Sequence, residues 1–143
     1  MPANKKSLAF TLIELLVVVS IIGLLATLVT ANLNAARSRS RDTVRKADLK
    51  NLQTALRLYY NDNGGYPSTV DALSVSNPVY MNKIPSDPLP DQTYSYVNDS
   101  LTDMFYLTAC LENTSDANCS TVAVGTTQSE FSCSSGCFYQ IKP

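Results

Sequence analysis

The residues of this chain that could do chemistry are a lone acid in an apolar segment and four clustered cysteines. Glu14 is the one charged residue between Phe10 and Ala36, a run long enough to cross a bilayer, which takes about 20 apolar residues. A carboxylate in hydrocarbon has to be neutralised or paired. No cationic side chain lies near Glu14 in the sequence, so the partner of this carboxylate is the first question that the chain poses. A protonated Glu14 near the membrane interface is the alternative.

The four cysteines, Cys110, Cys119, Cys133 and Cys137, all lie in the last third of the chain. An even number beside a membrane or export segment predicts disulfides formed in an oxidising compartment. Of the three pairings, we favour Cys110–Cys119 with Cys133–Cys137, because the stretches between these neighbours are loop-like. Free thiols are the alternative. A zinc site is disfavoured because the chain has no histidine and the cysteine spacing is poor for a zinc ribbon.

An enzyme has little support in this sequence. Histidine and tryptophan are absent, and no phosphate loop, serine nucleophile motif or nominated pair of carboxylates is present. Four acids occur on predicted loops at short spacing: Asp87, Asp91, Asp99 and Asp103. We interpret them as solvated acids, with a calcium site as the alternative, because the spacing is not that of an EF-hand. The sequence therefore predicts no catalytic residue, no cofactor and no metal.

The amino-terminal segment has the layout of an export signal. Met1 to Ala9 carries two lysines, Lys5 and Lys6, directly before the apolar run. The run is longer than the usual signal core of about 7–15 residues, and no Ala-x-Ala cleavage site lies near its end. We therefore expect the apolar run to be retained in the mature protein.

The residues around this point carry a specific resemblance. The stretch Leu8-Ala9-Phe10-Thr11-Leu12-Ile13-Glu14-Leu15-Leu16-Val17-Val18 resembles the class III signal of type IV pilins and type II secretion pseudopilins. In that family a prepilin peptidase cuts before the Phe and methylates the new amino terminus. The resemblance implies a cut between Ala9 and Phe10, an N-methylated Phe10, and a Glu14 that meets the amino terminus of a neighbouring subunit. Because Phe10 lies four positions before Glu14, one helical turn away, its new amine could also pair with Glu14 of the same chain.

The sequence departs from the family pattern in two places. Ala9 stands where the family usually has Gly, and the apolar segment lacks the Pro that many members carry there. The resemblance is close over Phe10–Gly23, weaker to about Pro67 and weaker still to about Val97. The last third matches no motif.

The resemblance implies a structural subunit of a type IV pilus-like filament or a type II secretion pseudopilus. Before assembly, such a subunit would be a single-pass protein of the cytoplasmic membrane, with its soluble carboxy-terminal part, the head, outside. Prepilin peptidase and an inner-membrane assembly platform would then help it form a homopolymer in the periplasm or outside the cell. The alternative is a membrane-anchored binding module that does not polymerise, such as a minor pilin-like adhesin or DNA receptor. A pilus, a pseudopilus and a DNA-uptake filament share this stalk, so all three stay open.

Charge is distributed unevenly along the chain. Residues 37–57 hold seven basic and two acidic side chains, whereas residues 58–143 hold two basic and nine acidic ones. We interpret Arg37, Arg39, Arg41 and Arg45 as a solvated collar at the membrane edge that pairs with acidic heads of neighbours in a filament. These arginines could instead bind phosphates of lipid or DNA. Alternate residues of a helix do not all lie on one face, however, which disfavours a dedicated DNA-binding groove. Charge counting alone would place the head in the cytoplasm; we follow the more specific leader motif, which places it outside.

One long helix is predicted from about Thr11 to Tyr60. Its second half carries an apolar stripe at three- and four-residue steps, made of Val44, Ala47, Leu49, Leu52, Leu56 and Tyr59. The Asn, Gly and Pro residues of 61–67 should end it. A capping box at Ser68 should then start a short helix that ends near Leu73.

The remaining chain predicts a small sheet. Strand-like runs occur at residues 93–97, 104–111, 122–124 and 138–142, and 104–111 is apolar on both faces, as in a central strand. Antiparallel strands behind a long helix make an α+β domain, which also resembles the pilin fold. We thus expect a leader at 1–9, an apolar assembly helix at 10–36 and a soluble head at 37–143.

Overall fold

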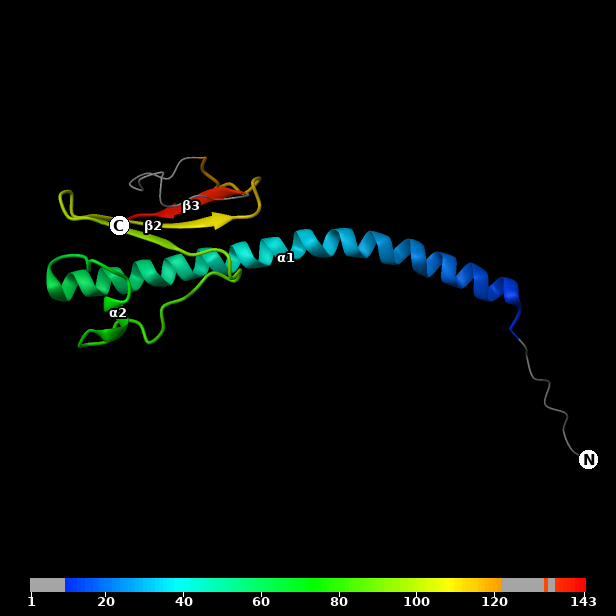
Figure 1. Cartoon of the computed structure of the whole chain (residues 1–143), viewed down its shortest axis with the longest axis horizontal. Helices are drawn as coiled ribbons and strands as arrows, with labels where there is room; N and C mark the ends of the chain where they lie inside the picture. Colours follow the sequence, from blue (N-terminus) through cyan, green and yellow to red (C-terminus); the bar gives the residue numbers. More distant parts are fainter. Residues whose placement is uncertain (1–9, 122–132, 134–135) are drawn as a thin grey trace, which may run out of the picture. The chain divides into compact units, whose positions relative to one another are not determined.

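The computed structural model describes residues 10–121, 133 and 136–143, without the side chains of residues 28, 30 and 31. Its elements are α1 (Leu12–Asn63), α2 (Ala72–Val75), β1 (Ser95–Asp99), β2 (Met104–Leu111) and β3 (Cys137–Ile141) (Figure 1). The chain divides into two compact units, residues 1–37 and 38–143, which are described separately below. A long amino-terminal helix with a small antiparallel sheet confirms the predicted α+β, pilin-like fold.

Helix α1 runs without interruption because no Gly or Pro occurs between Leu24 and Asn63. It ends where the sequence predicts. Gly64 takes a positive φ of 70°, and its N–H donates to the Tyr60 carbonyl oxygen at 2.8 Å. Glycine adopts this left-handed conformation without steric cost, which makes it the common terminator of helices.

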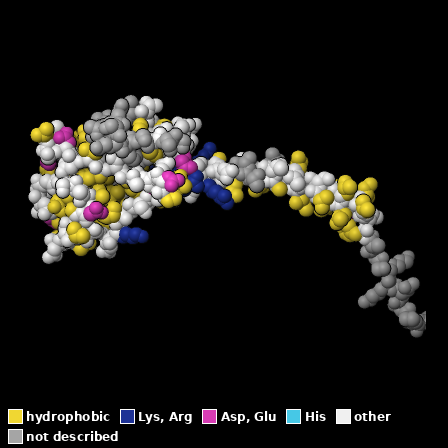
Figure 2. Space-filling model, in the orientation of Figure 1, with side chains coloured by type: hydrophobic (Ala, Val, Ile, Leu, Met, Phe, Trp, Pro, Cys, Tyr) yellow, Lys and Arg dark blue, Asp and Glu magenta, His cyan; other side chains and the backbone are white. Residues whose placement is uncertain are grey.

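The first unit exposes its apolar side chains. Phe10 and Leu12 are 75% and 82% exposed, and most of the large apolar residues that follow are at least half exposed. The hydroxyls of Ser20 and Thr27 donate to the carbonyls of Leu16 and Leu24, so they are compatible with an apolar surrounding. Figure 2 shows hydrophobic side chains along this segment. By length and apolarity, α1 could cross a membrane.

The sheet of the second unit has the order β1-β2-β3, with both pairs antiparallel. Strand β2 is central, as predicted, and Phe105, Leu107 and Leu111 on it are fully buried. Strand β1 begins two residues later than predicted. The strand predicted at 122–124 lies outside the described residues.

Helix α1 supplies one side of the core of the second unit, and the sheet supplies the other. The buried cluster consists of Leu49, Leu52, Ala55, Leu56, Leu73, Phe105, Leu107, Ala109, Leu111, Cys137 and Tyr139. The predicted stripe is wrong at its start, because Val44 and Ala47 are exposed. Towards the amino terminus, the buried face of the helix instead continues from Leu49 to Arg45 and Asp42, which lie about one and two helical turns earlier.

The segment between α1 and β1 packs as a loop with one short helix. The predicted capping box at Ser68 is wrong: α2 starts at Ala72, and its N-cap Asp71 makes no side-chain capping bond. Backbone bonds form the turn instead, with the Leu73 N–H donating to the Val70 carbonyl at 3.0 Å. Tyr80 and Ile84 of the following stretch pack on the core.

Candidate functional site

The start of α1 is a reciprocal cap made by Thr11 and Glu14. The Thr11 N–H and hydroxyl donate to Glu14 Oε2 at 3.0 and 2.6 Å, and the Glu14 N–H donates to Thr11 Oγ1 at 3.3 Å. This is the capping box of Ser/Thr-x-x-Glu/Gln sequences. The motif is visible in the stretch Thr11-Leu12-Ile13-Glu14, so this cap is a local feature that was not among the predictions above. In the lone chain, therefore, the Glu14 carboxylate binds its own helix start.

The predicted processing site lies at the edge of the described chain. Phe10 is exposed and directly precedes the capped helix, whereas Ala9 lies outside the described residues. The cut between Ala9 and Phe10, and the pairing of Glu14 with an amine of Phe10, therefore stay predictions. The cap does show that a helix starts within two residues of the predicted new amino terminus.

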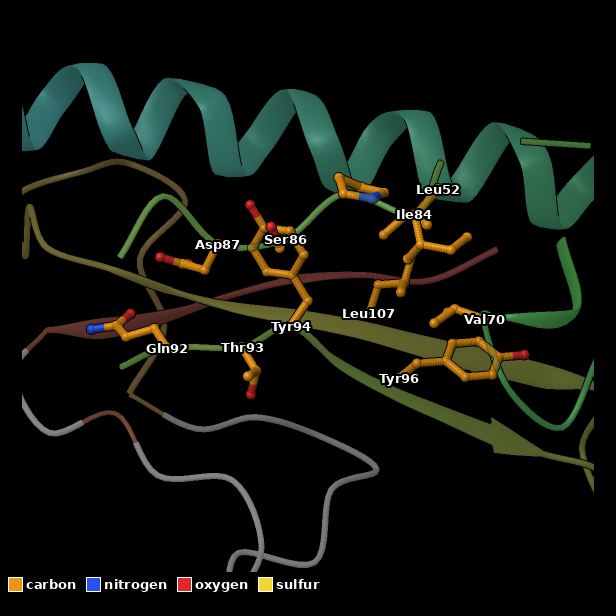
Figure 3. A pocket seen from close by; sticks show the side chains of 11 residues that line it. Leu52, Val70, Ile84, Ser86, Asp87, Gln92, Thr93, Tyr94, Tyr96 and Leu107 are labelled. Atoms are coloured by element: carbon orange, nitrogen blue, oxygen red, sulfur yellow. The ribbon is translucent and has the colours of Figure 1, made fainter. Parts of the chain in front are cut away.

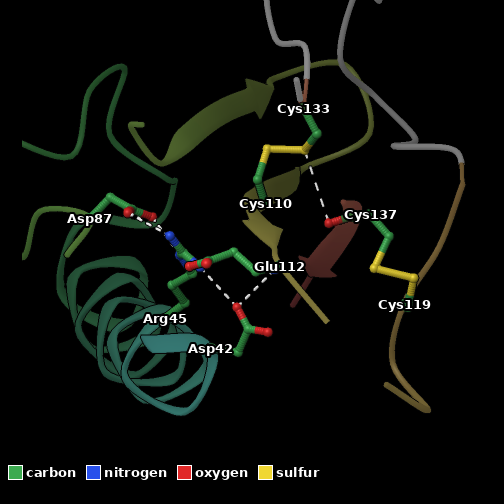
Figure 4. Close-up of a disulfide and its surroundings, with 8 residues drawn as sticks. All are labelled: Asp42, Arg45, Asp87, Cys110, Glu112, Cys119, Cys133 and Cys137. Atoms are coloured by element: carbon green, nitrogen blue, oxygen red, sulfur yellow. Dashed lines mark hydrogen bonds and ion pairs between the residues drawn. A yellow bond between two sulfur atoms is a disulfide. The ribbon is translucent and has the colours of Figure 1, made fainter. Parts of the chain in front are cut away.

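A second group of charges lies where α1 enters the second unit (Figure 4). Arg45 is fully buried and forms a bidentate pair with Asp87, with Nε and Nη2 at 2.8 and 2.9 Å from the two carboxylate oxygens. Its Nη1 donates to Asp42 and Glu112 at 2.8 Å each. The prediction of a solvated collar is thus wrong for Arg45. Asp87 and Glu112 lie 42 and 67 positions away in sequence, so local pattern could not show them.

The partners of Arg45 are held in turn. Asp42 accepts the backbone N–H groups of Glu112 and Asn113 at 3.0 and 2.9 Å, and Arg41 donates to Glu112 through Nε at 2.7 Å. The bonds from Arg41, followed by those from Arg45, outweigh burial and lower the pKa of Glu112 to about 2. Burial alone would lower the pKa of Arg45, but the hydrogen bonds that it donates to three carboxylates raise it. The cluster therefore connects α1 to the end of β2 and to the segment between α1 and β1, residues 64–94, which we call the proline-rich loop.

The neighbouring basic residues differ in their surroundings. Lys46 donates to Asp116 at 2.5 Å, which lowers the pKa of that carboxyl, and lies over the Tyr139 ring at 5.6 Å from its centre. Arg37 and Arg39 are exposed, and within the described parts of the chain they make no ion pair. Of the four arginines predicted to form a solvated collar, Arg37 and Arg39 therefore fit the prediction, whereas Arg41 and Arg45 bind carboxylates.

The disulfides join Cys110 to Cys133 and Cys119 to Cys137. The favoured pairing of sequence neighbours is therefore wrong. In the sheet, Cys137 lies opposite Leu111, one position beyond Cys110, and successive side chains of a strand point to opposite faces. Cys110 and Cys137 consequently face opposite sides of the sheet, and their partners, Cys133 and Cys119, both lie in the connection between β2 and β3 (Figure 4).

The four loop acids do not converge. Asp87 binds Arg45, Asp99 caps its own turn, Asp103 accepts the Tyr60 hydroxyl at 2.5 Å, and Asp91 is exposed. Across the described residues, no group of three or more His, Cys, Asp or Glu could hold a metal ion. The calcium alternative gains no support from this geometry.

Comparison with known proteins gives two adjacent family matches. Residues 4–30 match the prokaryotic N-terminal methylation motif, and residues 32–115 match type II secretion system (T2SS) protein G. The second match covers more than half of the chain. The chain belongs to the type II secretion system protein G family. Residues 116–143, which hold three of the four cysteines, lie beyond that match.

Curated relatives agree with this family. The type II secretion system core protein G of Pseudomonas aeruginosa is 37% identical over 99 residues, which are 59% of this chain and 70% of the relative. That of Escherichia coli K12 is 34% identical over 102 residues, 62% of this chain and 70% of the relative. The type IV wide pilus major component PilA4 of Thermus thermophilus is 47% identical over 64 residues, 45% of this chain and 49% of the relative. No solved structure matches significantly.

Proposed function

We propose that this protein G family member is a structural subunit of a type II secretion pseudopilus or a type IV pilus-like filament. The observation that carries the proposal is a methylation motif at residues 4–30 that includes the start of a long apolar helix, whose side chains are exposed in the lone chain. Similarity to both core protein G and a wide-pilus component supports a filament subunit over a binding module that stays monomeric. No catalytic role is proposed.

The exposed apolar segment accounts for two successive states of the subunit, one in the membrane before assembly and one in the filament. Its exposed side chains are unfavourable in water at about 25 cal/mol per Å² of apolar surface, so the segment needs lipid before assembly. In a filament, sister helices take the place of lipid. The head, outside the membrane, stays folded through both stages.

Glu14 changes its partner between the stages. In the lone chain its carboxylate is held by Thr11. After prepilin peptidase removes residues 1–9, the amine of Phe10 on a neighbouring subunit offers a cation, and the attraction between opposite charges is strong where water is excluded. The exchange favours the assembled state, in which Glu14 is removed from water.

The proposal extends to processing and location. Prepilin peptidase would cut between Ala9 and Phe10 and methylate Phe10, and an inner-membrane platform would assemble the homopolymer. The chain would then consist of a leader at 1–9, an assembly helix at 10–36 and a head at 37–143. Its filament would lie in the periplasm or outside the cell.

The test compares Glu14→Ala and Glu14→Gln with Ser20→Ala, a matched control whose hydroxyl bonds only its own helix carbonyl. We expect both Glu14 variants to reach the membrane at normal level but to lower filament yield at least about tenfold, because an unpaired buried charge costs about 3–5 kcal/mol. Ser20→Ala should assemble normally. Normal filament yield from Glu14→Ala would contradict the mechanism, and a protein that is monomeric in detergent and in cells would favour the binding module.

A further inference from the structure

The head contains an apolar pocket of about 200 Å³. Its lining includes side chains from α1, the proline-rich loop, β1 and β2: Leu52, Val70, Ile84, Tyr94, Tyr96 and Leu107 (Figure 3). Ser86 and Thr93, also in the lining, are exposed, so the pocket opens to the surface. A cavity of roughly 150 Å³ already holds a benzene ring. This pocket therefore has room for one branched aliphatic side chain.

The lining of the pocket also includes a buried polar atom that lacks a hydrogen-bond partner. Gln92 lines it, and its Oε1 is the only buried side-chain oxygen or nitrogen without a hydrogen-bond partner in the described parts of the chain. A buried acceptor without a donor costs about 1–3 kcal/mol. The best occupant thus combines an aliphatic group with a nearby donor.

Such a combination occurs at the turn between β1 and β2. Leu101 is 96% exposed there, more than any other large apolar residue among those described. Asp99 fixes the turn, because its carboxylate accepts the Leu101 N–H at 3.2 Å and the Thr102 hydroxyl at 2.6 Å. The adjacent Ser100 is exposed and carries a hydroxyl donor. The turn therefore presents a leucine and a donor in a fixed arrangement.

The turn and the pocket lie at different levels along α1 within one head. Asp103 of the turn binds Tyr60, whereas the pocket is lined by Leu52 and by Asp87, which binds Arg45. Eight to fifteen helical positions separate these levels, roughly 12–22 Å at 1.5 Å per residue. The two features of one head therefore do not meet, whereas copies that are shifted along the helix axis can bring them together. A head-to-tail contact of this kind, if it does not close into a ring, generates an open filament.

We infer that Leu101 of one subunit inserts into this pocket of a neighbouring subunit, where the Ser100 hydroxyl donates to Gln92 Oε1. Exposed Lys83 precedes Ile84 of the pocket and offers a cation to Asp99 and Asp103, which flank the leucine, while exposed Asp91 beside Gln92 reduces this attraction. The inference rests on the proposed filament function. It names a contact between heads, independent of the apolar helices.

The first test places the photo-crosslinking residue p-benzoylphenylalanine at position 101 of the full chain, in cells that assemble the filament. The expected product is a subunit dimer whose crosslinked peptide contains residues 84–96. The same residue at position 75 is the control, since Val75 is also strongly exposed but lies on α2. Crosslinks from position 101 to another region or to another protein would overturn the inference.

The second test uses Leu101→Asp, with Val75→Asp as its control. Because Leu101 is almost fully exposed, the aspartate should leave the fold and the membrane level unchanged and still lower filament yield at least about tenfold, as expected for a charge buried in an apolar site. Normal yield from Leu101→Asp would refute the contact while the filament function stands. A wild-type chain that builds no filament would instead refute the proposed function itself.

Discussion

The two units of this chain differ in how far their apolar side chains are buried and in how their charged side chains are paired. In the first unit, apolar residues such as Leu12 and Ile13 are exposed, and Glu14 has only a local partner, Thr11. In the second unit, leucines from α1 and β2 are fully buried, and even the charged Arg45 is buried with three carboxylates around it.

This difference separates what the chain can satisfy alone from what it leaves to its surroundings. The second unit pairs its buried charges and fills its core from its own residues. The first unit is continuous with it through α1 yet has no internal partner for its apolar surface among the described residues. The second unit is therefore satisfied by its own residues, whereas the apolar surface of the first unit needs a surrounding that the chain does not supply.

The largest effect should come from removing the cation at the centre of the head. Arg45→Ala leaves Asp42, Asp87 and Glu112 without their shared partner, and breaking a buried pair costs about 3–5 kcal/mol of unfolding free energy. Urea unfolding of the full chain in detergent, followed by tyrosine near-UV circular dichroism, measures it. The exposed Arg39→Ala is the control and should change stability by less than about 0.5 kcal/mol. Equal midpoints for both variants would show that the cluster does not stabilise the head.

A smaller effect should follow from opening either disulfide. Replacing both Cys110 and Cys133 with Ser should cost about 3 kcal/mol, because the bond closes a loop of about 20 residues in the unfolded chain. The Cys119 and Cys137 pair should cost a similar amount.

Single variants test the connectivity. Cys110→Ser should leave a reactive thiol at Cys133, which thiol labelling and peptide mapping identify. A free thiol at Cys119 would instead restore the pairing of sequence neighbours.

The smallest effect is a pH dependence confined to the head. The pKa of Glu112 falls from 4.5 to about 2 on folding, so its contribution is fully present above pH 4.5 and is lost as the pH falls toward 2. At about 1.36 kcal/mol per pKa unit the loss is at most about 3 kcal/mol. Glu112→Gln should flatten stability in this window, whereas the exposed Asp91→Asn should not. An unchanged slope in Glu112→Gln would contradict the assignment.

Local pattern predicted the parts of the fold that local physics decides. The absence of Pro, and of any Gly between Gly23 and Gly64, predicted the length of α1. Gly64 marked its end, and two apolar faces identified β2 as central. The reciprocal cap of Thr11 and Glu14 was also local and could have been predicted.

The remaining features depend on residues far apart in sequence. Arg45 is buried only because Asp87 and Glu112 reach it from a loop and from a strand end. The disulfide pairing depends on which face of the sheet Cys110 and Cys137 point to, and that requires the register between β2 and β3. Spacing along the chain carries neither kind of information.

Intact-mass analysis of the protein purified from membranes tests most directly whether the apolar segment is retained as an assembly element. The account predicts a chain that has lost residues 1–9, begins at Phe10, carries one added methyl group and lacks the hydrogens removed by two disulfides. A full-length mass would contradict the processing, and a chain that begins after residue 36 would show that the apolar segment is a removed signal.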